Sequence, residues 1–366
     1  MKSNYKKLGD YIRIVDERNK DNQITRLLGV SIEKKFIESI ANTIGTDMSI
    51  YKIVKKGQFA YGPVTSRNGD KVSIALLEEE ECIISSSYSV FEIIDTNLLL
   101  PEYLNLWFKR PEFDRYARFH SHGSAREIFD WDEMCNVELP VPEIDEQKKI
   151  VEAYNTIERR IALKRQINDN LEATAQAIYS KMFVEDIDKS NLPIGWSVSA
   201  LGEIAELSAG GDKPTIFSEI RTETCSIPIF SNGLEDDGLY GFTNKAKIID
   251  ESVTVSARGT VGYVFLREEP YVPIVRLISV VPNKQFVNAK YLYFALRELD
   301  LQSTGTSQQQ ITVPDYKKNQ IIVPNQQTLE NFTSKIEPIF ILHKQNKREI
   351  ESLTTLKSNC LALLSR

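Results

Sequence analysis

The sequence repeats itself once, and this repeat constrains the fold more than any other feature. Gly123-Ser124-Ala125 recurs as Gly305-Thr306-Ser307, and Val141-Pro142 recurs as Val323-Pro324, both at an offset of 182 residues. Earlier in each copy the offset is 193 residues, so the first copy is longer before this point. A chain with this layout is expected to fold into two similar units that carry different insertions.

The offset of 182 residues also carries an apolar stripe with helical spacing from one copy to the other. No glycine or proline lies between Glu143 and Phe183. Some 40 residues of helix would be roughly 60 Å long, which exceeds the usual length of a globular helix and suggests a coiled-coil partner. The residues expected to pack in this way are Ile150, Tyr154, Ile157, Ile161, Leu171 and Ile178 in the first copy and Phe332, Ile336, Ile339, Leu353 and Leu364 in the second.

The segment before each long helix mixes strand-like and helix-like patterns. Strands are predicted at 58–61, 72–77, 88–94, 226–230, 252–256 and 277–281, and short helices at 101–108 and 291–299. The predicted fold class is α+β. The predicted boundaries are a mixed domain at 1–142, a long helix at 143–183, a linker at 184–200, a second mixed domain at 201–324 and a second long helix at 325–366.

The charge of the chain limits how it could bind nucleic acid. The net charge is −6, and neither globular part is basic, with 19 basic and 22 acidic residues in 1–142 and 12 and 15 in 191–324. A protein that binds DNA on its own usually carries a basic surface. If DNA is the ligand, its cations must gather on one face, or a partner must neutralise many of the phosphates.

Cysteine use and hydropathy indicate a cytoplasmic protein without membrane contact. The four cysteines, Cys82, Cys135, Cys225 and Cys360, are scattered and lack CxxC spacing, so reduced thiols are expected and a metal site is not. No apolar stretch is long enough to span a bilayer. The first residues lack the apolar core of a secretory signal.

The motifs of common enzyme classes are missing. Neither GxGxxG nor GxxxxGK[ST] occurs, which argues against a glycine-rich phosphate loop. The GxSxG elbow and the HxE…PCxxC zinc motif are also absent. The chain contains 3 histidines, which leaves little material for general acid–base chemistry. The sequence therefore predicts no catalytic residue and no metal ligand.

Polar loops are the remaining candidates for function. Arginine and lysine suit guanine edges and phosphates, and glutamine and asparagine suit adenine edges. The candidate DNA-binding residues are Arg67, Arg115, Arg118, Ser124 and Arg126 in the first unit, and Lys213, Asn232, Lys245, Lys247, Arg258, Thr260, Gln308, Gln309 and Gln310 in the second. An ordinary solvated loop would explain any one of them, but the repetition of such loops favours a binding face.

Several short motifs, taken in order, resemble the specificity subunits of type I restriction–modification systems. They are Leu192-Pro193-Ile194-Gly195-Trp196 before Leu201-Gly202-Glu203-Ile204, Ala209–Pro214, Ser256–Gly262, and the Gly123 and Gly305 tripeptides, each followed by a Val-Pro before the long helix. The resemblance covers essentially the whole chain. Two departures are the lack of an acidic residue in Asn325-Gln326-Gln327, where the first copy has Glu146, and the lack of a Pro-x-Gly-Trp opening in the first unit.

The resemblance implies a subunit without catalytic activity, in which two target-recognition domains in a pseudo-two-fold arrangement each read one half of an asymmetric, interrupted DNA site. It implies that the two long helices pack antiparallel and set the spacing between the half-sites. It also implies double-stranded DNA and two adenine methyltransferase subunits as partners, which restriction and translocase subunits can join. This chain would then bind no cofactor, because S-adenosylmethionine, ATP and magnesium belong to the partner subunits.

Two rival functions are consistent with parts of the sequence. A free-standing nuclease or methyltransferase is disfavoured by the missing cofactor motifs, and a methylation assay on the chain alone would test it. A two-domain scaffold that holds proteins through a coiled coil, without DNA specificity, has a similar surface polarity. A strong salt dependence of DNA binding would favour DNA over the scaffold.

Overall fold

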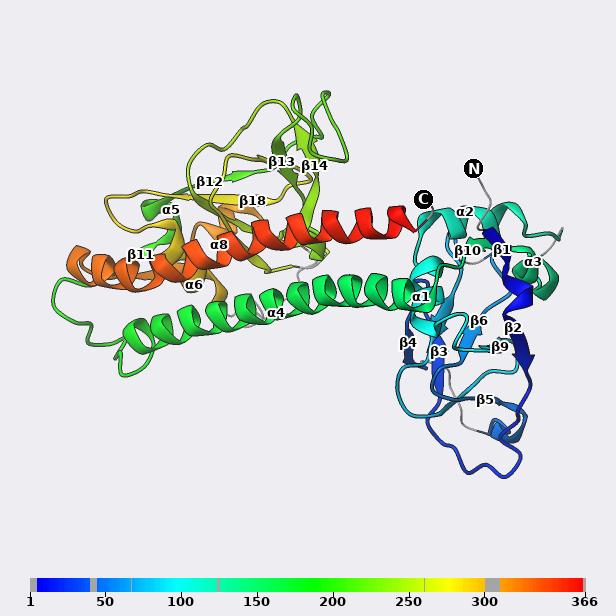
Figure 1. Cartoon of the computed structure of the whole chain (residues 1–366). Coiled ribbons are helices and arrows are strands. Elements are labelled where there is room, and N and C mark those ends of the chain that lie inside the picture. The colour runs from blue at the N-terminus through cyan, green and yellow to red at the C-terminus, as the bar shows by residue number, and fades with distance from the viewer. Residues whose placement is uncertain are drawn as a thin grey trace. The chain divides into compact units, whose positions relative to one another are not determined.

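The computed structural model of the chain describes residues 5–39, 45–66, 68–123, 126–259, 261–299 and 310–364. It divides into two compact units, one formed by residues 1–165 with 347–366 and the other by residues 166–346 (Figure 1). This division runs through the long helices, because each helix packs along part of its length on the core of one unit and along the rest on the other.

The first unit is built on a four-stranded antiparallel sheet. Its elements are β1 (Tyr5–Lys7), η1 (Leu8–Asp10), β2 (Ile12–Val15), β3 (Leu28–Val30), β4 (Phe36–Glu38), η2 (Met48–Ile50), β5 (Lys52–Val54), β6 (Phe59–Tyr61), β7 (Ile74–Leu76), β8 (Cys82–Ile84), β9 (Ser89–Ile93), α1 (Pro101–Phe108), α2 (Pro111–Phe119), α3 (Trp131–Asn136) and β10 (Glu138–Pro140). The main sheet has the order β2-β9-β6-β7, and the pairs β1-β10, β3-β4 and β5-β8 form small ladders.

The second unit is built on a sheet of the same kind. Its elements are β11 (Ser197–Ala200), α5 (Leu201–Ile204), β12 (Ala205–Ala209), β13 (Ile227–Phe230), η3 (Glu235–Gly238), β14 (Leu239–Thr243), β15 (Ser252–Val255), β16 (Val264–Arg267), β17 (Val272–Pro273), β18 (Ile278–Pro282), α6 (Ala289–Arg297), α7 (Val313–Tyr316) and β19 (Gln320–Val323). The main sheet has the order β12-β18-β15-β16, a second sheet has the order β14-β13-β17, and β11 pairs with β19.

The two units share one framework. The strand order β2-β9-β6-β7 corresponds to β12-β18-β15-β16, all with antiparallel pairing. The same hydrogen bonds recur at equivalent positions. The Tyr103 hydroxyl on α1 donates to the Pro140 carbonyl at 3.1 Å, and the Tyr291 hydroxyl on α6 donates to the Ile322 carbonyl at 2.6 Å. The repeat seen in the sequence is therefore a repeat of structure.

The insertions in the shared framework differ between the units. In both frameworks, extra strands are inserted at the same two connections. One connection follows the first strand of the main sheet (β2 or β12), and the other precedes the last of its strands along the chain (β9 or β18). In the first unit these connections carry β3, β4 and β5, and then β8. In the second unit they carry β13 and β14, and then β17, which pair into one three-stranded sheet. The framework is common, and the inserted sheets are different.

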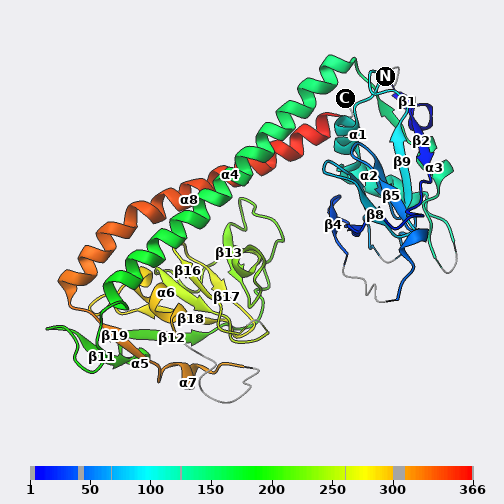
Figure 2. The ribbon, with the colours of Figure 1, turned by 90° about the horizontal axis from the view of Figure 1, so that it is seen from below.

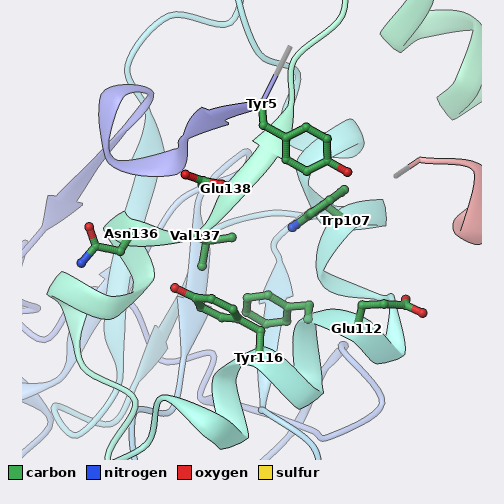
Figure 3. A pocket seen from close by; sticks show the side chains of 8 residues that line it. Tyr5, Trp107, Glu112, Tyr116, Asn136, Val137 and Glu138 are labelled. Atoms are coloured by element: carbon green, nitrogen blue, oxygen red, sulfur yellow. The ribbon is translucent and has the colours of Figure 1, made fainter. Parts of the chain in front are cut away.

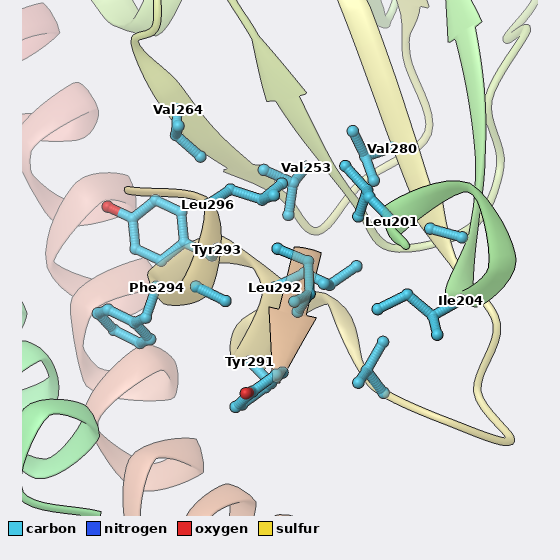
Figure 4. Packing of buried hydrophobic residues seen from close by; sticks show 14 of the residues in the cluster. Leu201, Ile204, Val253, Val264, Val280, Tyr291, Leu292, Tyr293, Phe294 and Leu296 are labelled. Carbon is cyan, nitrogen blue, oxygen red and sulfur yellow. The ribbon is translucent and has the colours of Figure 1, made fainter. Parts of the chain in front are cut away.

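The core of the second unit joins its sheet to α6 and to parts of both long helices. Val253, Val280 and Leu292 pack between the main sheet and α6 (Figure 4). An aromatic cluster continues from α6 onto the long helices, where Phe183 meets Phe332 with ring centroids 5.1 Å apart. The core of the first unit is equally aromatic, with Phe59, Phe91 and Phe108 in mutual contact.

The long helices are α4 (Ile144–Phe183) and α8 (Gln326–Leu363), and both predicted helices are confirmed. Pro338 lies inside α8 without ending it. Within the first unit, Ile157 and Ile161 of α4 form a buried cluster with Leu353 of α8. Within the second unit, the Asn346 side chain on α8 donates to the Asn168 side chain on α4 at 2.9 Å. In each unit the residue numbers of contacting positions run in opposite directions, so the paired segments are antiparallel (Figures 1 and 2).

The predicted packing residues occupy three kinds of position. Tyr154, Ile157, Ile161, Phe332, Ile336, Leu353 and Leu364 are buried, Ile150, Ile178 and Ile339 are partly buried against the cores, and Leu171 is half-buried. Several of them pack on a globular core as well as on the other helix, which the stripe alone did not indicate.

The predicted strands in both units and the short helices are confirmed, with ends that differ by a few residues. The expected linker 184–200 contains β11, whose four residues pair with β19 and so belong to the second unit. The other predicted domain boundaries stay predictions, because the contact-based division runs through the helices.

Candidate nucleic-acid interface

Some of the predicted DNA-binding residues lie outside the described part of the chain. These are Arg67, Ser124, Thr260, Gln308 and Gln309. The remaining candidates lie on α2 and the loop that follows it in the first unit, and on several loops of the second unit.

In the first unit, two of the candidate arginines are already paired with carboxylates. Arg115 lies on α2 and pairs with Glu112 at 3.1 Å, and Arg118 in the last turn of α2 pairs with Glu127. Arg126 is exposed on the following loop. Because exposed ion pairs gain little from each other, these arginines could exchange their partners for phosphate at low cost.

In the second unit, Asn232 joins three loops. Its amide nitrogen donates to the Val275 carbonyl at 2.7 Å, and its amide oxygen accepts from the Ala257 N–H at 2.8 Å. We call the surrounding residues 210–213, 231–233, 256–259, 274–276 and 310 the Asn232 loop group. Both ends of the Asn232 side chain are therefore used to hold loops, so this candidate positions its neighbours.

Arg258 and Gln310 meet at the edge of the Asn232 loop group. The Arg258 Nε donates to the Gln310 Oε1 at 3.1 Å, and the two residues form an isolated β-bridge. The Ile311 N–H donates to the Ala257 carbonyl at 2.9 Å, which fixes this segment against the loop after β15. Three residues that are distant in sequence, Asn232, Arg258 and Gln310, thus lie together, as a shared binding surface requires.

A glycine turn completes the loop group. The carbonyls of Gly210 and Gly211 accept from the Arg276 and Val275 N–H groups at 3.0 and 2.9 Å. A Cβ on Gly210 would lie 2.7 Å from the Ile274 nitrogen, so this position needs glycine. Lys213 follows the turn, and its ammonium lies 3.3 Å from the centroid of the Phe217 ring.

Lys245 and Lys247 lie on the connection between β14 and β15, where both are exposed. The Lys247 N–H donates to the Tyr271 carbonyl at 3.0 Å, so its backbone position is fixed beside the strand that leads to β17. No side-chain hydrogen bond among the described residues ties these lysines to the Asn232 loop group.

Two features of the structure were not predicted from the sequence. Arg276 is exposed in the Asn232 loop group. The sequence feature that could have identified it is its position as the single charged residue in Val272–Val280. Gln147 is fully buried at the start of α4, where its side chain accepts from the Leu100 N–H at 2.9 Å and donates to the carbonyls of Leu98 and Pro142. It links α1 to α4, a role that its position after Glu146 did not reveal.

The first unit also contains a pocket of about 420 Å³ beside α2 and β10 (Figure 3). Its walls are largely aromatic, and carboxylates lie among them. The lining residues are Tyr5, Trp107, Glu112, Phe113, Tyr116, Asn136, Val137 and Glu138. None of the predicted DNA-binding residues lines it. Burial raises the pKa of the Tyr116 hydroxyl, and the nearby Glu133 and Glu138 raise it further, so this tyrosine stays neutral.

The described ranges contain neither a metal-binding cluster nor a membrane-spanning helix. No group of three or more histidine, cysteine, aspartate or glutamate side chains there is placed to hold a metal ion. Nor does any helix in those ranges combine the length and apolar character needed to cross a membrane.

Comparisons with known proteins agree with the duplicated framework. Type I specificity subunit S.MpnORF507P of Mycoplasma pneumoniae is 27% identical over 244 residues, which is 65% of this chain and 63% of that protein. This chain therefore spans less than two thirds of that relative. The HindI specificity subunit of Haemophilus influenzae is 21% identical over 98% of this chain and 97% of its own length.

A solved structure shows the same fold over almost the whole chain. The type I restriction–modification S subunit of M. genitalium aligns with a TM-score of 0.62 and 14% identity, covering 99% of this chain and 96% of its own. Residues 3–173 and 193–352 each match the family described as the type I restriction modification DNA specificity domain. With two such domains that cover most of its length, the chain belongs to the family of type I restriction–modification specificity subunits.

Proposed function

We propose that this chain is the non-catalytic DNA-specificity subunit of a type I restriction–modification complex, and that each unit reads one half of an asymmetric, bipartite DNA site. The observation that carries this proposal is the common framework with different insertions. A shared framework presents the DNA-binding loops of both units in the same way, while different inserted sheets and loops provide different contacts to base edges.

The long helices set the spacing between the half-sites. Each helix contributes residues to both units, and the antiparallel contacts between them occur in both. Paired helices bury apolar side chains along their length and resist bending. The distance between the two DNA-binding units therefore depends on the number of helical residues.

Two adenine methyltransferase subunits dock on this chain, and restriction and translocase subunits can join the complex. The net charge of −6 supports a complex in which the partner subunits also bind the DNA, because those partners would supply much of the phosphate neutralisation. S-adenosylmethionine, ATP and magnesium would be held by those partners. The chain works in the cytoplasm, where its DNA is found.

Selection from a random-sequence DNA pool by the complex with the methyltransferase tests the proposal. The expected result is a site with two defined blocks and an unspecified gap, bound with an affinity that falls steeply with salt. A single contiguous block would contradict the bipartite proposal. Salt-insensitive or absent DNA binding would favour the protein scaffold, and methyl transfer by the chain alone would contradict the non-catalytic role.

A further inference from the structure

We propose that Arg276 is a specificity-determining residue of the second unit, and that its guanidinium reads a guanine in the half-site which that unit recognises. This inference rests on the proposed function and assigns it to one side chain in the Asn232 loop group. It follows from an unusual backbone, the contacts that hold it, and the state of the arginine.

The backbone at Val275 and Arg276 adopts a costly conformation. Both residues are in the left-handed region, with φ of 51° and 61°. A β-branched residue such as valine is a genuine outlier there, so the surrounding structure must hold both residues in this conformation. Val275 is also 51% exposed, so burial of its side chain does not explain why the chain adopts this turn.

Two neighbouring loops and one hydrogen bond within the turn hold this backbone in place. The Val275 and Arg276 N–H groups donate to the Gly211 and Gly210 carbonyls at 2.9 and 3.0 Å. The Asn232 amide donates to the Val275 carbonyl at 2.7 Å, and the Leu277 N–H donates to the Ile274 carbonyl at 3.0 Å. These contacts use the donors and acceptors on both sides of the Arg276 Cα and fix its position.

The result of this arrangement is an arginine whose guanidinium has no partner among the residues that the structure describes. Five arginines lie in residues 166–346. The other four have partners: Arg221 pairs with Glu269, Arg258 with Gln310, Arg267 with Thr254 and Asp237, and Arg297 with Glu172. Arg276 is exposed and, within the described part of the chain, its guanidinium has neither a hydrogen bond nor an ion pair. In an acidic protein, such a cation is available to an external acceptor.

The rigidity of the turn favours a base edge over a phosphate. A phosphate contact tolerates a mobile side chain, because the charge acts over a distance and in many geometries. A bidentate contact to guanine O6 and N7 needs the planar guanidinium at a defined place and angle. A strained backbone held by hydrogen bonds fixes the Cα from which the guanidinium extends, whereas a solvated loop would suffice for a phosphate.

The test uses the full chain in complex with its methyltransferase subunits. The preferred site of the wild-type complex is first selected from a random-sequence pool. The dissociation constant is then measured for that site and for every single-base change in it, for wild type, Arg276→Ala, Arg276→Lys and the matched control Arg221→Ala. Arg221 is also exposed, but it pairs with Glu269 outside the loop group.

We expect Arg276→Ala to weaken binding to the selected site by roughly 10- to 100-fold and to abolish the preference for guanine at one position of one half-site. Arg276→Lys should restore affinity in part without restoring the preference, and Arg221→Ala should change neither. Unchanged thermal unfolding of Arg276→Ala will show that the exposed substitution leaves the fold intact.

Two results would overturn the assignment. Equal weakening on all sequences, with a smaller salt slope, would place Arg276 on a phosphate, and unchanged binding would remove it from the interface. Both differ from failure of the proposed function, in which the wild-type complex selects no bipartite site at all.

Discussion

At the scale of single residues, Glu92 links the stability of the first unit to pH. Its carboxylate on β9 accepts from the Gln58 amide at 2.8 Å and from Arg13 at 2.6 and 2.8 Å. The Gln58 hydrogen bond, together with Arg13, holds the pKa of Glu92 below its usual value of 4.5. Because the folded-state pKa is depressed, Glu92 stabilises the fold above about pH 4.5, and this contribution is lost as the pH falls through the folded pKa.

We therefore expect Glu92→Gln to flatten the acid limb of the stability profile. The free energy of unfolding, measured by urea titration from about pH 6 to about pH 3, should fall less steeply than in wild type. Glu80→Gln removes an exposed carboxylate from the same unit and serves as the control. An identical acid limb in Glu92→Gln and wild type would refute the role of this carboxylate.

The candidate DNA-binding residues show which features of single residues could be predicted from the sequence. Residue type and loop position led to Asn232, Arg258 and Gln310, which the fold brings together. Sequence did not show that Asn232 is a positioning residue, because its two hydrogen bonds depend on loops brought together by the sheet. Nor did it single out Arg276, since a left-handed backbone at a non-glycine residue leaves no signature in composition.

At the scale of elements, a buried amide pair marks the seam between the long helices in the second unit. Asn346 is 1% exposed and Asn168 is 6% exposed, and the Asn168 amide also donates to the His343 carbonyl at 3.3 Å. A polar pair in an apolar seam lowers stability but selects one register, because any slip leaves buried amides unpaired.

Replacing one member of this pair should cost more than replacing both. We expect Asn346→Leu to lower the free energy of unfolding by about 1–3 kcal/mol, since the Asn168 amide then lacks its partner. The double replacement with Asn168→Leu should recover part of that loss. Urea unfolding of the four variants of the double-mutant cycle measures the coupling, and additive effects would contradict a direct interaction.

Elements with a strong period were predictable, and the short inserted strands of the first unit were not. The long helices carry an apolar stripe over 40 and 38 residues, which identifies them without tertiary context. The inserted strands β3, β4, β5 and β8 have three residues each, too few for alternation to be recognised. Their pairing is set by contacts with the framework and by turns, so it emerges only in the fold.

At the scale of the whole molecule, the helices are expected to determine the gap in the DNA site. Insertion of seven residues after Arg165 in α4 and after Asn346 in α8 keeps the heptad phase and adds roughly 10 Å of helix. We expect the selected site to keep both blocks, with a gap about three base pairs longer at 3.4 Å each. Insertion into α4 alone breaks the pairing and is the control, and an unchanged gap in the double insertion would refute the spacing role.

Both frameworks carry their insertions in the same two connections, and in both the chain returns to the main sheet after each insertion. The insertions of one unit can therefore be exchanged without disturbing the strands that support them or the long helix that follows. We expect exchange of the insertions within those connections to give a new half-specificity in one step, while the opposite half of the target is retained. The fold separates the part that must stay constant from the part that is free to vary.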